Sequence, residues 1–399
     1  MPYDAITIDT NTFIQTGIAL ETGLLAQLEQ FKEAPVDLVL SEIVTREVLK
    51  HLQQMTKKGR DAGLAALTRL EQLQLVAEAD RERLKQVAES VVDSREAARQ
   101  RLARFLEATG AQAVRASHCS IDDLLKLYFA ASAPFEPTGD KKFEFPDAIA
   151  LLSLQKWAVD GGKRILAVSA DKGWAAFAET SEQIDVEEDL AKALETLQEH
   201  AAAAEATVAK LMEAVVAGTQ PDAANAIEEG LTASLADWVF SAEGSGSFYL
   251  EADSNTLRFG SYELAKIGDD YDITVVRLGH EIVAARIGAT FTATAEADFS
   301  LAVWDGIDRE YVNMGGASAE TEIEFEGAFL VTLYGDLAGP LDDIDVGEVE
   351  VVEAIDSVDF GEIEFDYGDP DDFDALLESE PETEAAEEPA PAAGTHNGV

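Results

Sequence analysis

Two acidic residues stand directly behind short apolar stretches in the N-terminal half of the sequence. Asp9 follows Ala5–Ile8 (AITI), and Asp171 follows the stretch RILAVS at 164–169. Both stretches have the composition of buried strands, and parallel sheets bind ligands at the carboxyl ends of their strands. If the two strands are neighbours, the two carboxylates face each other. With no cation beside them in the sequence, such a pair is unfavourable unless a positive ion separates the charges, and a divalent metal is the usual one.

Two further acids can join this pair. Asp147 opens the helix that leads into 164–169, and Glu47 lies on the helix that follows a second apolar stretch, DLVL at 37–40. At about 100° per residue, Glu47 falls on the border of that helix's apolar stripe, whereas Glu42 points away from it. Oxygen ligands without a His or Cys cluster favour Mg²⁺ or Mn²⁺ over zinc. Such a site suits phosphodiester hydrolysis, because metal ions bind the scissile phosphate and lower the pKa of a water.

The elements that must position these acids alternate between strands and helices. Short apolar strands separated by helices predict a parallel sheet covered on both faces, so the expected fold class is α/β. Ser41 can cap the helix after the second strand, which is expected to end near Met55, and a further helical stretch follows at about 63–108. We therefore expect a first domain at 1–178 with a helical insertion at about 56–115.

The rest of the sequence divides into three parts with different patterns. Residues 179–238 look helical and predict a connector. Residues 239–337 alternate polar and apolar side chains, which predicts an antiparallel β domain whose role the sequence does not define. Residues 338–399 contain 21 Asp and Glu and no Lys or Arg, and beyond about residue 368 they are rich in Pro, Ala and Glu. This composition predicts a largely disordered acidic tail.

Composition and charge exclude several classes of protein. The chain has 399 residues, of which 29 are Lys or Arg and 78 are Asp or Glu, and its formal net charge is −49. This charge excludes a nonspecific basic nucleic-acid binder and a polybasic membrane anchor. The single cysteine, Cys119, excludes a disulfide framework and a cysteine-based zinc site. No signal peptide and no stretch long enough to span a bilayer are visible, so we expect a cytoplasmic protein with no membrane contact.

The charge is distributed unevenly along the chain. Residues 1–177 carry 22 basic and 25 acidic side chains, whereas residues 178–399 carry 7 basic and 53 acidic ones. Regions with such different electrostatics are expected to have different roles. Three explanations of the acidic part stay open: adaptation to high salt, recruitment of a protein partner through the β domain or the tail, and a tail that restrains the protein by covering its basic residues. A homo-oligomer also stays open.

Four short motifs together resemble the PIN-domain ribonuclease family: DTN at 9–11, Glu47 on the next helix, FPDAIALLSL around Asp147 and VSADKGW around Asp171. The resemblance covers about residues 1–177. It implies a PIN-like fold and metal-dependent endonucleolytic cleavage of single-stranded or structured RNA, as in toxin-type members, with an antitoxin as a further partner. The catalytic and metal-binding residues that it implies are Asp9, Glu47, Asp147 and Asp171, and the polar groups that would hold these carboxylates are Asn11 and Ser169.

The same residues also allow other interpretations. Taken alone, Asp9 is a turn residue, Glu47 a solvated helix residue, and Asp147 and Asp171 are helix-terminal acids. The four together, in order and near strand ends, favour the metal site. A rival is a PIN-like scaffold that binds RNA or a protein without cutting. A phosphatase with an aspartyl nucleophile is disfavoured, because Asn11 stands where a second Asp would act as general acid and base.

The predicted insertion is the most basic part of the sequence. About 100 residues separate Glu47 from Asp147, about twice what a compact PIN domain needs, and the helical stretch at 63–108 is the excess. The ordinary interpretation of its arginines, which we favour, is a solvated surface with intrahelical ion pairs. The functional interpretation is a surface that contacts the phosphates of RNA. The arginines in question are Arg95, Arg99, Arg101 and Arg104.

Overall fold

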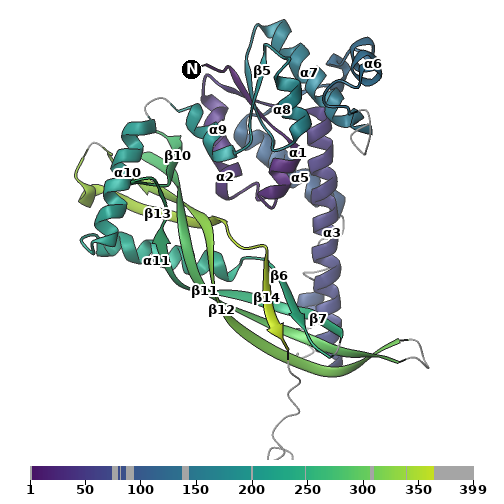
Figure 1. The fold of residues 1–399 in the computed structure, drawn as a ribbon, viewed down its shortest axis with the longest axis vertical. Helices are drawn as coiled ribbons and strands as arrows, with labels where there is room; N and C mark the ends of the chain where they lie inside the picture. Colours follow the sequence, from purple (N-terminus) through teal and green to yellow (C-terminus); the bar gives the residue numbers. More distant parts are fainter. Residues whose placement is uncertain are drawn as a thin grey trace, which may run out of the picture. The chain divides into compact units, whose positions relative to one another are not determined.

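The computed structural model describes most of the chain (Figure 1). The described residues are 2–73, 80, 82–86, 94–136, 143–198, 201–247, 249–305, 310–337 and 339–363. They divide into two compact units. The first unit comprises Met1–Ser241, Asn255–Glu296 and Glu320–Val358, and the second comprises Ala242–Ser254, Ala297–Ala319 and Asp359–Val399.

A parallel sheet organises the N-terminal part of the first unit. Its strands are β1 (Ala5–Ile8), β2 (Asp37–Ser41), β3 (Gln112–Val114), β4 (Ile165–Val168) and β5 (Ile184–Glu187). They lie in the order β3-β2-β1-β4-β5, and every neighbouring pair is parallel. The prediction of a parallel sheet is therefore confirmed. The sequence pattern does not predict β3 and β5, the short strands at the two edges.

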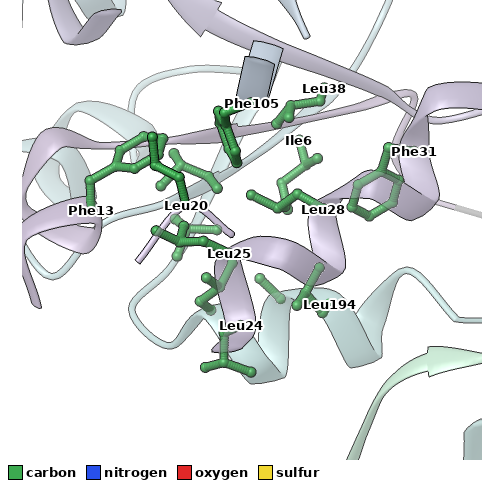
Figure 2. Packing of buried hydrophobic residues seen from close by; sticks show 14 of the residues in the cluster. Ile6, Phe13, Leu20, Leu24, Leu25, Leu28, Phe31, Leu38, Phe105 and Leu194 are labelled. Atoms are coloured by element: carbon green, nitrogen blue, oxygen red, sulfur yellow. The ribbon is translucent and has the colours of Figure 1, made fainter. Parts of the chain in front are cut away.

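Helices cover both faces of this sheet, as the buried strands require. They are α1 (Thr10–Gln15), α2 (Gly23–Ala26), η1 (Gln27–Glu33), α3 (Glu42–Gln72), α5 (Ser94–Thr109), η2 (Ala116–His118), α6 (Ile121–Ala130), α7 (Phe145–Gly161), α8 (Lys172–Ala178) and α9 (Leu190–Thr196). On one face, Ile6 and Leu38 pack with Leu25, Phe105 and Leu194 (Figure 2). On the other face, strand residues such as Ala5 and Ile165 pack against α7 and Trp174 of α8.

The α/β prediction holds, but three predicted boundaries move. The helix after β2 does not end near Met55: α3 runs without a break to Gln72, since residues 56–72 are mostly strong helix formers. β5 and α9 lie beyond the boundary at 178 and complete the sheet and its cover. The β region does not end at 337, because two strands follow within 339–363. The remainder of the predicted tail, 364–399, lies outside the described residues.

The remainder of the first unit is a second sheet with two helices against it. Here α10 (Ala201–Val216) packs against β10 (Ile273–Leu278), and α11 (Pro221–Ala236) packs against β13 (Asp345–Glu353). The sheet order is β10-β11-β12-β13, and β10 with β11 and β12 with β13 are antiparallel pairs. The long strands β11 (Ile282–Asp305) and β12 (Glu310–Tyr334) belong to it. β7 (Tyr249–Leu264) pairs with β11, and the short strands β8 (Lys266–Ile267) and β9 (Asp270–Tyr271) form a hairpin. The predicted antiparallel β domain is confirmed.

The second unit contains the remaining parts of β7, β11 and β12. A two-stranded sheet of β6 (Ser241–Ser245) and β14 (Ser357–Glu362) also contributes to it. Its small core is formed by Ala297, Phe299 and Ile363. In both units, none of the described helices is long and apolar enough to cross a membrane.

Candidate active site

The candidate site lies at the carboxyl edge of the parallel sheet, where the chain changes direction across it. From β1 the chain continues to β2 and β3 on one side, and it later returns to β4 and β5 on the other. Ligands of open α/β sheets bind at this switch point. Because β1 and β4 pair in parallel, with Ile8 opposite Val168, the residues that follow these strands come to the same edge. Asp9 caps the N-terminus of α1, and Asp171 caps that of α8.

Asp9 is the most buried of the four predicted acids, with 4% of its surface exposed. Its Oδ1 accepts a hydrogen bond from the Thr10 amide at 2.6 Å, and its Oδ2 accepts one from the Ser169 hydroxyl at 2.9 Å. The pKa of Asp9 is raised from 3.8 to about 6. Burial is the largest cause, the charges of Asp147 and Asp171 add to the rise, and the two hydrogen bonds oppose it. The carboxylate is therefore held in place in an environment that disfavours its negative charge.

Asp147 lies in the first turn of α7 and reaches the same environment. The indole Nε1 of Trp174 donates a hydrogen bond to Asp147 Oδ1 at 3.0 Å, and the Trp174 side chain is fully buried. Burial raises the pKa of Asp147, the charges of Glu47 and Asp171 add to the rise, and the Trp174 hydrogen bond opposes it. Trp174 thus fixes the direction of this carboxylate and favours its ionised form.

Glu47 joins the site through a threonine. It is half-buried on α3, at the border of the apolar side where the periodicity placed it. The Thr10 hydroxyl donates to Glu47 Oε2 at 2.7 Å, while the Thr10 amide donates to Asp9. Glu42 instead accepts a hydrogen bond from the Ala116 amide and pairs with Arg46. One residue, Thr10, therefore connects the acids of β1 and α3.

Asp171 is fixed by the backbone of its own turn. Its amide donates to the Ser169 hydroxyl at 3.1 Å, and its Oδ1 accepts from the Gly173 amide at 2.5 Å. A Cβ at position 173 would lie 2.8 Å from Asp171 Oδ1 and 3.2 Å from Cβ of Pro134, so a larger residue here would have to displace the Asp171 carboxylate. Since Ser169 also donates to Asp9, it links the two acids that follow β1 and β4.

The charges that act on Asp9 and Asp147 come mainly from neighbouring carboxylates. The charged groups with the largest effects on the pKa values of Asp9 and Asp147 are carboxylates, and no cation is among them for these described residues. All candidate ligands are hard oxygen donors, which suits Mg²⁺ or Mn²⁺. As they stand, however, no three His, Cys, Asp or Glu side chains of the described residues are arranged to hold one metal ion. Binding an ion would require the carboxylates to turn toward one another.

One of the two polar residues predicted to hold the carboxylates does so and the other does not, and the sequence did not point to two further residues of the site. Ser169 holds Asp9 as expected, but Asn11 is exposed on α1. Thr10, its neighbour in the DTN motif, makes the hydrogen bonds instead. The role of Trp174 was also not predicted. A buried indole N–H requires an acceptor. The signal in the sequence was limited to the position of Trp174, three residues after Asp171.

The arginines of α5 favour the ordinary interpretation. Arg101 forms an ion pair with Glu21 at 2.6 Å and donates to the Ile18 carbonyl at 3.1 Å, so it fastens α5 to the loop after α1. Arg99 pairs with Glu96 within the helix at 3.5 Å. Arg104 is exposed. Contact with RNA phosphates at these positions stays a prediction.

A comparison with known families agrees with this geometry. Residues 6–174 match the family described as PIN domain. The N-terminal part of this chain is a PIN domain. The match includes all four acids and the strands β1, β2, β3 and β4 that carry the site. No curated protein and no solved structure matches the chain.

Proposed function

We propose that the PIN domain is a metal-dependent endoribonuclease that hydrolyses RNA phosphodiester bonds with Mg²⁺ or Mn²⁺ held by Asp9, Glu47, Asp147 and Asp171. PIN domains are generally nucleases that use divalent metals, which supports the reaction class. The observation that carries the proposal for this chain is the buried Asp9, whose pKa is raised to about 6 in the presence of two further carboxylates. Burial and the neighbouring carboxylates make the negative charge of Asp9 unfavourable, and a bound dication would compensate for this free-energy cost.

The residues of the chain have distinct tasks in this proposal. Ser169 and the Thr10 amide hold Asp9, the Thr10 hydroxyl holds Glu47, and Trp174 holds Asp147. These hydrogen bonds already restrict the carboxylates in the absence of metal, so less conformational entropy is lost when an ion binds. A bound Mg²⁺ or Mn²⁺ would neutralise charge on the phosphate and lower the pKa of the attacking water.

The test is incubation of the purified full chain with total cellular RNA, with Mn²⁺ or with chelator, followed by mapping of new 5′ ends. We expect new ends with Mn²⁺ only. Asp9→Asn should abolish cleavage because it removes one of the ligand charges. The matched control is Asp160→Asn, since Asp160 is an exposed carboxylate of the same domain, paired with Lys156 on the surface of α7. Cleavage that persists in Asp9→Asn would refute the site.

The alternative is a PIN scaffold that binds RNA or a protein without cutting. The absence of three preassembled ligands among the described residues favours this alternative over a preformed metal site. Metal titration separates the two proposals. A nuclease binds Mn²⁺ and turns over, whereas a scaffold gives no metal-dependent products even when RNA binding is observed. A toxin-type role, with an antitoxin as partner, depends on the nuclease being active and is part of the first proposal.

A further inference from the structure

Three large aromatic side chains contact one another on the surface of the second unit. The rings of Tyr249 and Tyr311 have centroids 4.7 Å apart, and those of Trp304 and Tyr311 are 5.1 Å apart. Between 52% and 54% of each residue is exposed. We call these three residues the aromatic patch. They come from β7, β11 and β12.

Further apolar side chains on the same strands are exposed, but they alternate with the aromatic residues and so lie on the other face of the strands. They are Val303, Val312 and Met314, between 42% and 45% exposed. The three rings of the aromatic patch alone form the contiguous surface, and soluble proteins seldom expose such a group unless it binds something. Trp and Tyr are also residue types that are enriched in protein interfaces and in their energetically dominant positions. The aromatic patch therefore has the composition of an interface.

The charge of the second unit restricts the partner. Its described residues include no Lys or Arg, and the sequence of the unit adds a single arginine, Arg309, between β11 and β12. The exposed acids whose side chains are described are Glu243, Glu251, Asp253, Asp298, Asp359 and Glu362. The hydroxyls of Ser318 and Ser254 donate to Asp298 at 2.6 and 2.7 Å and lower its pKa, so this acid stays ionised. A polyanion such as RNA is repelled by this surface, and a cationic partner is attracted.

We propose that the aromatic patch docks an arginine-rich segment of a protein partner. A guanidinium stacks on the face of Trp or Tyr and also forms paired hydrogen bonds with carboxylates, so a segment with several arginines can use both the aromatic and the acidic residues of the unit. A lysine offers a point charge and stacks less well. The C-terminal residues of this chain are not the complement, because 364–399 contain 12 Asp and Glu and no Lys or Arg.

The test measures binding by the full chain at 150 mM NaCl, where the reach of the net charge is limited to about 8 Å. The probes are a fluorescein-labelled peptide of six Arg-Gly repeats, the matching Lys-Gly peptide and a 12-nucleotide uridine RNA. We expect the Arg peptide to bind about tenfold more tightly than the Lys peptide. The double variant Trp304→Ser/Tyr311→Ser should lose about tenfold in affinity for the Arg peptide, although its charge is unchanged.

A matched control separates the aromatic patch from exposed aromatic residues in general. Phe129 of α6 is 80% exposed, and Phe129→Ser should bind the Arg peptide as the natural chain does. Thermal unfolding checks that the double variant is folded. If it is not, the single variant Tyr249→Ser replaces it, because it removes one exposed ring of the aromatic patch without changing the charge, and it should weaken binding of the Arg peptide about threefold.

Several results would overturn the proposal. Equal affinity of the double variant and the natural chain would show that net charge alone attracts the peptide. Equal affinity for the Arg and Lys peptides would remove the role of stacking. Uridine RNA that binds the natural chain and is lost from the double variant would make the aromatic patch a nucleic-acid surface. A dimer in sedimentation that dissociates in the double variant would assign the surface to a second copy. None of these results bears on the proposed nuclease activity.

Discussion

Replacing Asp9 by Asn should stabilise the metal-free protein, and by more at pH 7.5 than at pH 5. The pKa of Asp9 is raised from 3.8 to about 6 in the folded protein. Ionised Asp9 therefore destabilises the fold, and this destabilisation is absent below the unfolded value and grows as the pH rises toward the folded value. The shift corresponds to about 3 kcal/mol at pH 7.5 and to about half of that at pH 5.

The substitution also has an unfavourable part. Asn keeps an acceptor for the Thr10 amide, but its NH₂ group faces the Ser169 hydroxyl that donates to Asp9, and rearranging this hydrogen bond costs about 1 kcal/mol. The expected net gain is therefore about 2 kcal/mol at pH 7.5 and less than about 1 kcal/mol at pH 5. Asp160→Asn, which removes an exposed charge, should change stability by less than about 0.5 kcal/mol at both pH values.

Urea unfolding in chelator, followed by tryptophan fluorescence, measures these differences. The lower pH is set at 5 because the isoelectric point is about 4.2, and a protein with no net charge tends to associate. Added Mn²⁺ should stabilise the natural chain and have little effect on Asp9→Asn. The reasoning is refuted if Asp9→Asn is no more stable than the natural chain at pH 7.5, or if its gain is the same at both pH values.

Three further predictions address other residues. Trp174→Phe removes the donor to Asp147 and should weaken Mn²⁺ binding about tenfold in calorimetric titration, since hydrogen bonds to charged groups contribute about 1.5–3 kcal/mol; unchanged affinity would contradict this role. Gly173→Ala places a Cβ 2.8 Å from Asp171 Oδ1. It should lower the free energy of unfolding by about 1–3 kcal/mol in a urea titration and should also lower cleavage in the RNA assay. Removal of 364–399, which contain 12 Asp and Glu, should tighten RNA binding in anisotropy titrations at 50 mM NaCl but not at 300 mM NaCl. An equal effect at both salt concentrations would argue against electrostatic repulsion.

The strands that position the site could be predicted because they are buried. β1, β2 and β4 lie in the middle of a sheet covered on both faces, so their residues are almost uniformly apolar and visible in the sequence. β3 and β5 lie at the edges. Two of the three residues of β3 are exposed, and three of the four residues of β5 are half-buried, so neither has a clear pattern. Edge position removed the signal on which the prediction depended.

The acids of the site could also be predicted from the sequence, whereas the groups that hydrogen-bond to them could not. The positions of Asp9 and Asp171 follow from strand order and chain direction, which periodicity and topology rules restrict. The hydrogen bonds of Thr10 and Trp174 depend on side-chain direction at two helix starts, and no spacing rule specifies this. The motif DTN contained both candidates, Thr10 and Asn11, and only the backbone of α1 decides that the threonine faces the acids and the asparagine faces solvent.

Negative charge has two different physical consequences in this chain. At the sheet edge, burial raises the pKa values of Asp9 and Asp147, so these acids store unfavourable energy that a cation can release. In the second unit, Asp298 is exposed and its pKa is lowered by two serine hydroxyls, so it stays charged without strain. Net charge alone therefore does not predict a ligand. In the two proposals, the buried acids bind a small ion that replaces their lost hydration, whereas the exposed acids pair with a flexible cationic side chain that stays hydrated.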